Sequence, residues 1–178
     1  MTDWRSYFLA IALLVLGAQS VWAEGVEEYR VKSALVLNFA RFTDWPAGAL
    51  GGEDTPFNVC VMGEAHLAKD FEFLEGKHIG ARPVVVIVDA SLEQSIACQV
   101  IFVAGADREK LPRLFSAIYG RPILTIGEMS TFTDSGGMVN LVNVNGRLKF
   151  IVDLQNLHAS KMNMSARLLK LAYAVKSG

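Results

Sequence analysis

The sequence predicts an α/β fold: a largely parallel sheet with helices on both faces, plus an N-terminal apolar helix, a late β-hairpin and a C-terminal helix. Three observations support this prediction. Short runs rich in Val and Ile are apolar throughout, helical stretches separate these runs, and a later segment carries an Asn-Gly pair. Apolar strands that alternate with helices are typical of a parallel sheet that is covered on both faces.

Four runs with many β-branched residues are the expected strands. They are FNVCVMG (57–63), RPVVVIVD (82–89), QVIFVAG (99–105) and PILTIG (122–127). The stretches between them have helical patterns, and the third begins at a capping Asp107 and stops at Gly120. They are HLAKDFEFLEG (66–76), SLEQSIA (91–97) and DREKLPRLFSAIYG (107–120).

Residues 138–154 predict a hairpin, because Asn145-Gly146 is a preferred two-residue turn between strands. The pairs expected on its core face are Asn143 with Leu148, Leu141 with Phe150, and Val139 with Val152. A final helix is expected over 165–176, with Ser165 as its N-cap. Its expected apolar side consists of Leu168, Leu169, Leu171 and Ala172.

The N-terminal helix is expected over 27–44, and it should end near Asp44 because the residue before Pro46 is pushed out of the α region. One line along this helix has steps of three and four residues. Its members are Val31, Leu35, Asn38, Phe42 and Trp45. We assign Asn38, Phe42, Trp45 and Pro46 to packing and expect a buried, hydrogen-bonded Asn38, since an unsatisfied buried amide costs about 1–3 kcal/mol.

Another face of the same helix is the candidate surface for a partner or a dimer. It carries Arg41 together with Leu37, and Phe39 lies nearby. An aromatic stripe at this spacing fits either a core or a partner surface. A helix that is apolar nearly all round is either fully buried or shared between two molecules.

The first 23 residues have the features of a secretory signal peptide. Arg5 precedes an apolar run over 7–18, and Val21 and Ala23 are small residues two positions apart, so cleavage is expected after Ala23. The apolar run is shorter than the roughly 20 residues that span a bilayer, although a retained anchor is the alternative. Residues 24–178 are then expected to form a single exported domain that is not embedded in the membrane.

The sequence lacks the usual signatures of catalysis and of nucleic-acid binding. The formal net charge is −1, whereas a protein that binds DNA or RNA has clustered Lys and Arg. The three histidines have no zinc-ligand spacing, and no G-x-S-x-G motif is present. The doublet Gly136-Gly137 precedes a strand and is assigned a structural role. We therefore expect no enzyme activity, metal or cofactor, and a protein that binds others.

The two cysteines, Cys60 and Cys98, permit one disulfide in an exported protein. The bridge would close a loop of about 38 residues, which is worth roughly 4 kcal/mol on the chain-entropy model. Two buried thiols that never react are the alternative, because Cys is among the most buried residue types.

Several stretches in order resemble the YfiR family of small exported bacterial proteins, from about Tyr29 to Ala174. They include VKSALVLNFARFTDWP, FNVCVMG, GKHIGARPVVV, CQVIFVAG, GRPILTIGE, GGMVNLV, GRLKFIVDLQNL and SARLLKLA. The resemblance implies an α/β domain in the periplasm, where Cys60 and Cys98 stand at the family's common cysteine pair. The namesake's second cysteine pair has no counterpart in this sequence, so a switch based on two disulfides is not implied.

The resemblance also implies a function. The namesake represses an inner-membrane diguanylate cyclase by binding its periplasmic sensor part, which lowers cyclic-di-GMP and biofilm formation, and homodimers occur in the family. The leading hypothesis is therefore a periplasmic repressor of such a signalling enzyme. The alternative is a periplasmic module that binds a small ligand without repressing anything, at the carboxyl ends of the strands near Gly63, Ala104 and Gly127.

Overall fold

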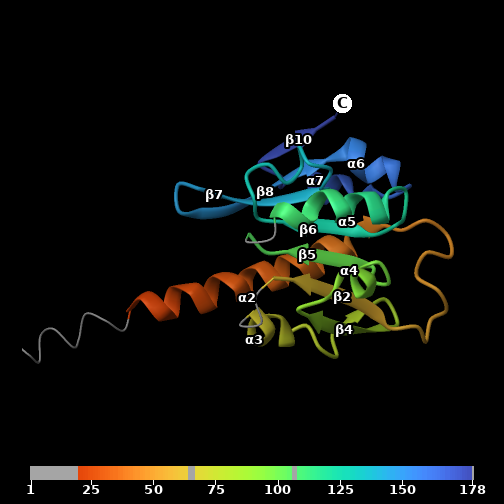
Figure 1. Cartoon of the computed structure of the whole chain (residues 1–178), viewed down its shortest axis with the longest axis horizontal. Coiled ribbons are helices and arrows are strands. Elements are labelled where there is room, and N and C mark those ends of the chain that lie inside the picture. Colours follow the sequence, from red (N-terminus) through yellow and green to blue (C-terminus); the bar gives the residue numbers. More distant parts are fainter. Residues whose placement is uncertain (1–19, 64–66, 106–107, 178) are drawn as a thin grey trace, which may run out of the picture.

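The computed structural model describes residues 20–63, 67–105 and 108–177 and confirms the mixed α/β fold (Figure 1). The expected signal peptide, residues 1–23, lies largely outside these described residues. An eight-stranded sheet has the order β10-β8-β7-β6-β5-β2-β4-β3. Its central pairs, from β4 through β2, β5 and β6 to β7, are all parallel. The prediction of a largely parallel sheet is thus confirmed.

The strand bounds of this sheet follow the predicted runs closely where the runs are rich in Val and Ile. The strands are β2 (Phe57–Met62), β3 (His78–Ile79), β4 (Arg82–Val88), β5 (Val100–Val103), β6 (Leu124–Gly127), β7 (Val139–Val144), β8 (Arg147–Asp153) and β10 (Ala174–Lys176). A separate two-stranded sheet joins β1 (Thr43–Asp44) to β9 (Asn163–Met164). This small sheet connects the end of the first helix to the C-terminal part of the chain.

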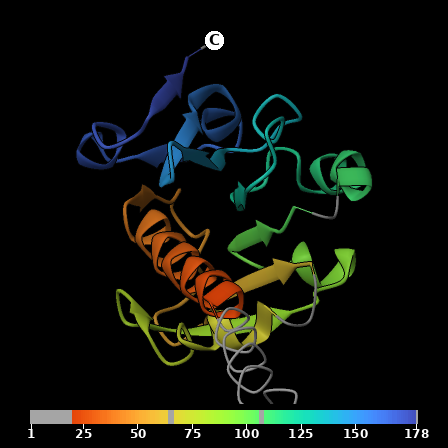
Figure 2. The same cartoon turned by 90° about the vertical axis from the view of Figure 1, so that its left-hand side faces the viewer.

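Helices pack on both faces of the large sheet, as the end-on view in Figure 2 shows. On one face lie α2 (Ser20–Arg41), α3 (Ala68–Glu72) and α7 (Ala166–Leu169), over a core that includes Phe39, Phe57 and Phe102. On the other lie α4 (Leu92–Ser95) and α5 (Leu111–Ile118), over a second core with Cys60, Ile101 and Phe132. The remaining helical turns of the described residues are η2 (Arg108–Lys110) and α6 (Leu154–Ala159).

The hairpin of β7 and β8 has the predicted turn and register. Asn145 and Gly146 both have positive φ, of 53° and 74°, which this turn requires. The pairs Asn143–Leu148, Leu141–Phe150 and Val139–Val152 are all formed. Val139, Leu141, Phe150 and Val152 belong to the core on the α2 side. An Asn-Gly turn therefore sets the register from local sequence alone.

The prediction of a C-terminal helix over 165–176 is wrong beyond the first helical turn. Ser165 does cap a helix, because its hydroxyl accepts a hydrogen bond from Leu168 N, but α7 ends at Leu169. The chain then extends: Tyr173 N donates to Phe150 O, and β10 pairs in parallel with β8. Pairing with an otherwise open sheet edge overrides the helical pattern here. As a result Leu171, expected on the apolar side, is 68% exposed.

The N-terminal helix ends earlier than expected, at Arg41 rather than near Asp44. Two side chains that follow it bind carbonyl groups of its last turn. Thr43 Oγ1 donates to Phe39 O at 2.8 Å, and Trp45 Nε1 donates to Ala40 O at 3.2 Å. These bonds satisfy carbonyls that have no partner within the helix. Thr43 and Asp44 are then available to pair as β1.

Candidate functional site

Helix α2 packs on the core with the side opposite to the predicted one. Val31 is 52% exposed, Phe42 is 39% exposed, and Asn38 is exposed as well. The expectation of a buried, hydrogen-bonded Asn38 is therefore wrong. Among residues 28–43, those that this helix and the turn after it bury are Lys32, Ser33, Val36, Leu37, Phe39, Ala40 and Thr43. Because the helix is apolar nearly all round, its periodicity did not determine which side would face the sheet.

The residues predicted for packing on this line form instead an outward row, which we call the outer stripe of α2. It consists of Val31, Leu35, Asn38 and Phe42; Leu35 is half-buried and the others are exposed. Trp45, at the end of the predicted line, is half-buried and packs edge-to-face on Phe57 with 5.5 Å between ring centroids. The next residue, Pro46, is half-buried too. Trp45 packs inward because it follows the helix and does not continue its periodicity.

The three residues proposed for a partner surface lie in different environments. Phe39 is fully buried and packs edge-to-face on Phe150 at 4.9 Å, and Leu37 is only 5% exposed. Arg41 is exposed, and its Nη2 donates to His78 O at 3.0 Å. Arg41 thus joins the end of α2 to the edge strand β3. Of the three residues, only Arg41 is accessible from solvent in the isolated chain.

A polar cluster that the sequence interpretation missed joins α2 to the carboxyl end of β6. Glu128 follows β6 directly, and its Oε2 lies 2.5 Å from the Nζ of Lys32. Its Oε1 accepts from Tyr29 OH at 2.9 Å and from Gly105 N at 3.0 Å. The side chains of Lys32 and Glu128 are only 7% and 11% exposed. Lys32 also pairs with the more exposed Glu28 at 2.7 Å. The buried ammonium of Lys32 and the buried carboxylate of Glu128 therefore neutralise each other.

This Glu128 cluster occupies part of the edge where a ligand crevice was expected. Gly127 ends β6 there, and Gly63 and Ala104 directly follow the neighbouring parallel strands β2 and β5. The carboxylate of Glu128 accepts a hydrogen bond from Gly105 N, so this backbone N–H is not available to a ligand. The signal available in the sequence was the Glu that follows Gly127, together with Lys32 as a charged residue in an apolar helix. Each was visible alone, but only the fold brings the two together.

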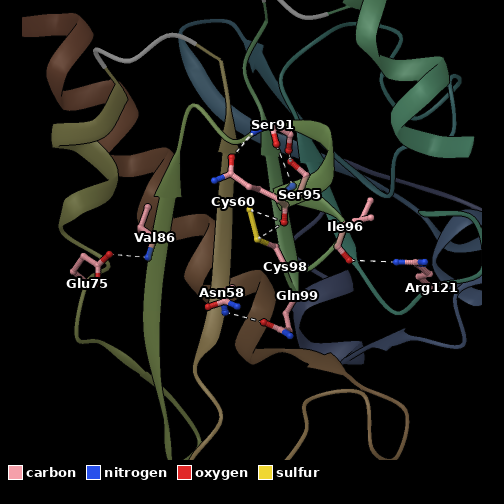
Figure 3. The surroundings of a disulfide bond; sticks show 11 residues. Asn58, Cys60, Glu75, Val86, Ser91, Ser95, Ile96, Cys98, Gln99 and Arg121 are labelled. Atoms are coloured by element: carbon pink, nitrogen blue, oxygen red, sulfur yellow. Dashed lines mark hydrogen bonds between the residues drawn. A yellow bond between two sulfur atoms is a disulfide. The ribbon is translucent and has the colours of Figure 1, made fainter. Parts of the chain in front are cut away.

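The Cys60–Cys98 disulfide is present, on the α4 and α5 side of the sheet (Figure 3). The two Cα atoms are 5.9 Å apart, a separation that suits a disulfide, and both residues are buried. One local contact before Cys98 and one contact between strands after it hold the segment that carries this cysteine. Ser91 and Gln94 form a reciprocal capping box at the start of α4, and Gln99 Oε1 accepts from Asn58 N at 2.7 Å. The bridge thus ties the central strand β2 to the connection that leads into β5.

A half-open pocket of about 530 Å³ lies between α5, α6 and the segment before β7. Its wall is mostly apolar, with Phe115, Tyr119 and Met138. Asn156 also lines it, and its Nδ2 donates to Gly137 O at 2.9 Å. Gly136 and Gly137 have packing roles here. A Cβ on Gly137 would overlap the ring of Phe132, and Gly136 has a φ of 114°, which disfavours any side chain.

The part of the chain that the structure describes contains neither a cluster of metal ligands nor a membrane-spanning helix. Within residues 20–63, 67–105 and 108–177, no three His, Cys, Asp or Glu side chains gather as a metal site. Among the helices of this same part, none is both long enough and apolar enough to cross a bilayer.

A family model described as "DUF4154: YfiR/HmsC-like" matches residues 29–173 of the chain. Two solved structures are similar in fold. One is a conserved domain protein from Vibrio cholerae O1 biovar El Tor, with a TM-score of 0.51 and 10% identity over 67% of this chain and 55% of that one. The other is an ABC domain in complex with L-Trp from Streptococcus pneumonia, with a TM-score of 0.50 and 12% identity over 72% and 57%. This chain thus spans little more than half of either structure.

Proposed function

Because the chain belongs to the YfiR/HmsC-like family, we propose that it is a periplasmic protein that binds and represses the periplasmic sensor part of an inner-membrane diguanylate cyclase. Membership implies periplasmic regulation of such a cyclase in general, and members are known as regulators rather than enzymes. Binding to this chain holds the cyclase in its inactive form, which lowers cyclic-di-GMP and biofilm formation. The single observation behind the proposal is the family match over nearly the whole of the expected mature chain.

The outer stripe of α2, with Arg41 at its end, is the proposed contact surface for the cyclase. Val31 and Phe42 are large apolar side chains exposed on a long, well-packed helix, a feature of surfaces that bind other proteins. Asn38 lies between them and offers an amide to a partner. Leu37 and Phe39 support this surface from beneath, because their side chains fix the helix against the sheet. The same stripe is available for a homodimer, whose formation would compete with the cyclase.

The test is genetic and uses a matched control. Deleting the gene should raise cyclic-di-GMP and biofilm, and the unchanged gene should restore both. The variant Val31→Ser with Phe42→Ser should fail to restore them while the protein accumulates normally. Val144→Ser is the control, because Val144 is half-buried on β7 and lies outside both the outer stripe of α2 and the pocket beside α5. Unchanged cyclic-di-GMP after deletion, beside an intact neighbouring cyclase gene, contradicts the proposal.

A second candidate function is the binding of a small periplasmic ligand without any repressor role. The pocket beside α5 favours it, since its volume of about 530 Å³ falls in the range of ligand sites and its wall is apolar with a few hydroxyl groups. A specific ligand should raise the melting temperature by mass action in a thermal-shift screen of metabolites. A positive screen together with unchanged cyclic-di-GMP in the deletion strain would favour this second function.

A further inference from the structure

The near-zero net charge conceals a strong separation of charge along the sheet. Residues 24–105 contain 12 acidic and 6 basic side chains, whereas residues 106–178 contain 5 acidic and 10 basic ones. The first group supplies β2, β3, β4 and β5, and the second supplies β6, β7, β8 and β10. These groups occupy opposite halves of the sheet order, so the half of the chain that ends at β10 is net basic and the half that supplies β2 to β5 is net acidic.

The C-terminal segment concentrates this positive charge. Residues 154–177 include four Lys or Arg and contain no Asp or Glu. Lys176 is neutralised within the fold, because its Nζ lies 2.6 Å from Asp134. Lys161, Arg167 and Lys170 are exposed. In both overall views the segment forms one end of the molecule, opposite α3 and β4 (Figure 2).

Apolar side chains are exposed between these cations. Leu171 is 68% exposed, Tyr173 is 58% exposed and Val175 is 40% exposed. These side chains lie at the edge of the sheet, because β10 pairs with β8 along one side and no described strand pairs with its other side. Val175 is in register with Val152, which faces the α2 side, so Tyr173 and Val175 point to the face on which α7 packs. We call this surface the basic edge; it consists of Arg167, Lys170, Leu171, Tyr173 and Val175.

We propose that the basic edge docks on the surface of an anionic phospholipid bilayer. Lys and Arg next to Leu and Tyr are the residues that interfacial segments use, with the rings and aliphatic groups at headgroup level and the cations on lipid phosphates. Protein interfaces show the opposite trend for Lys, which is depleted at their centres. The net acidic half of the chain, residues 24–105, is repelled by the same lipids, so the charge separation also orients the molecule with β10 toward the membrane.

This inference goes beyond the proposed regulation of a cyclase and does not depend on which enzyme is regulated. Ser165 N donates to Phe42 O, so the basic edge begins beside the end of the outer stripe of α2. A chain held at the bilayer by α7 and β10 would therefore keep the outer stripe close to the membrane. Docking would raise the local concentration of the chain around any membrane enzyme.

Vesicle sedimentation tests the proposal with protein purified in the form that the cell produces. Vesicles of phosphatidylcholine mixed with phosphatidylglycerol should pellet the protein at low salt, and vesicles of phosphatidylcholine alone should not. Each exposed cation near an anionic surface contributes about a fivefold change in partitioning. Arg167→Gln with Lys170→Gln should therefore weaken binding roughly 25-fold. Leu171→Ser with Tyr173→Ser should weaken it as well, at high and at low salt.

The matched control is Arg108→Gln with Arg113→Gln, which removes the same charge from exposed positions at η2 and α5. It should leave partitioning unchanged within about twofold if the basic edge is the contact. Circular dichroism and the melting temperature show that each variant is folded. An equal loss in the control, or the absence of any preference for anionic vesicles, overturns the proposal. The second outcome leaves an acidic protein surface as the occupant of the basic edge.

Discussion

Replacing Lys32 with Met should destabilise the protein by about 3 kcal/mol. Removing one partner of a buried ion pair typically costs about 3–5 kcal/mol, because the other charge stays buried without its partner. The ammonium and carboxylate of Lys32 and Glu128 are 2.5 Å apart and almost fully covered. Glu128 keeps hydrogen bonds from Tyr29 OH and Gly105 N after the substitution. These two remaining bonds put the expected cost at the lower end of the range.

A double variant measures the interaction energy between Lys32 and Glu128 apart from the contacts that each side chain makes with other residues. Glu128→Gln alone should also be destabilising, because Lys32 then loses its buried carboxylate and retains the more exposed Glu28 and the ring of Tyr29. Lys32→Met combined with Glu128→Gln should cost clearly less than the sum of the two single changes, since no buried charge is left alone. Urea unfolding followed by circular dichroism gives the free energy of each variant. Lys69→Met is the control, since Lys69 is exposed on α3 and its loss should change stability by less than about 0.5 kcal/mol.

Two results would refute this reasoning about the pair. A cost below about 1 kcal/mol for Lys32→Met would mean that water solvates Glu128 freely. Additive costs in the double variant would mean that the two side chains do not act as a pair.

Three further predictions concern stability, each measured by urea unfolding. Cys60→Ser should cost about 2–5 kcal/mol, and a thiol assay on denatured, unreduced wild-type protein should find no free thiol; two free thiols would contradict the bridge. Gly137→Ala should cost about 1–3 kcal/mol, because its Cβ overlaps a buried ring, whereas Gly52→Ala, whose Cβ would meet only Thr55 Oγ1 at an ordinary contact distance of 3.8 Å, should be nearly neutral; equal costs would refute the packing role. Asn38→Ala should change stability by less than about 0.5 kcal/mol, against about 3–5 kcal/mol for Phe39→Ala; a large effect at Asn38 would restore the original prediction of burial.

The sheet could be predicted because its signals are local. Runs such as RPVVVIVD favour extended backbone wherever they occur, and they are apolar on both sides, which only a sheet covered on both faces can bury. The turn at Asn145-Gly146 needs positive φ at two successive residues, and this requirement alone sets the register of β7 and β8. The disulfide could be expected but not proved, since spacing in the sequence does not give a distance between Cα atoms.

The errors have a different origin, because they depend on which surfaces remain open after the sheet has formed. The stretch that ends at Lys176 has helical periodicity, yet the edge of β8 offers unpaired backbone groups, and pairing as β10 satisfies them. The contact between Lys32 and Glu128 spans 96 positions, so no local pattern could indicate it. Interaction surfaces were hardest to predict for the same reason, because a side chain is exposed only where no other segment of the folded chain covers it.

The orientation of α2 is the outcome of such a competition, and it links the Glu128 cluster to the proposed contact surface. Apolar packing alone would accept several rotations of this helix, because its apolar residues lie on every side. A rotation that buried Asn38 would carry Lys32 away from Glu128 and leave that carboxylate under the helix without a cation. An unpaired buried charge makes an alternative helix rotation costly, even where the formed ion pair adds little to the stability of the native rotation. The ion pair therefore selects the rotation that turns Val31 and Phe42 outward. Lys32→Met should accordingly weaken repression of the cyclase as well as stability, and Lys32→Met combined with Glu128→Leu, which permits both rotations, should recover stability without fully recovering repression.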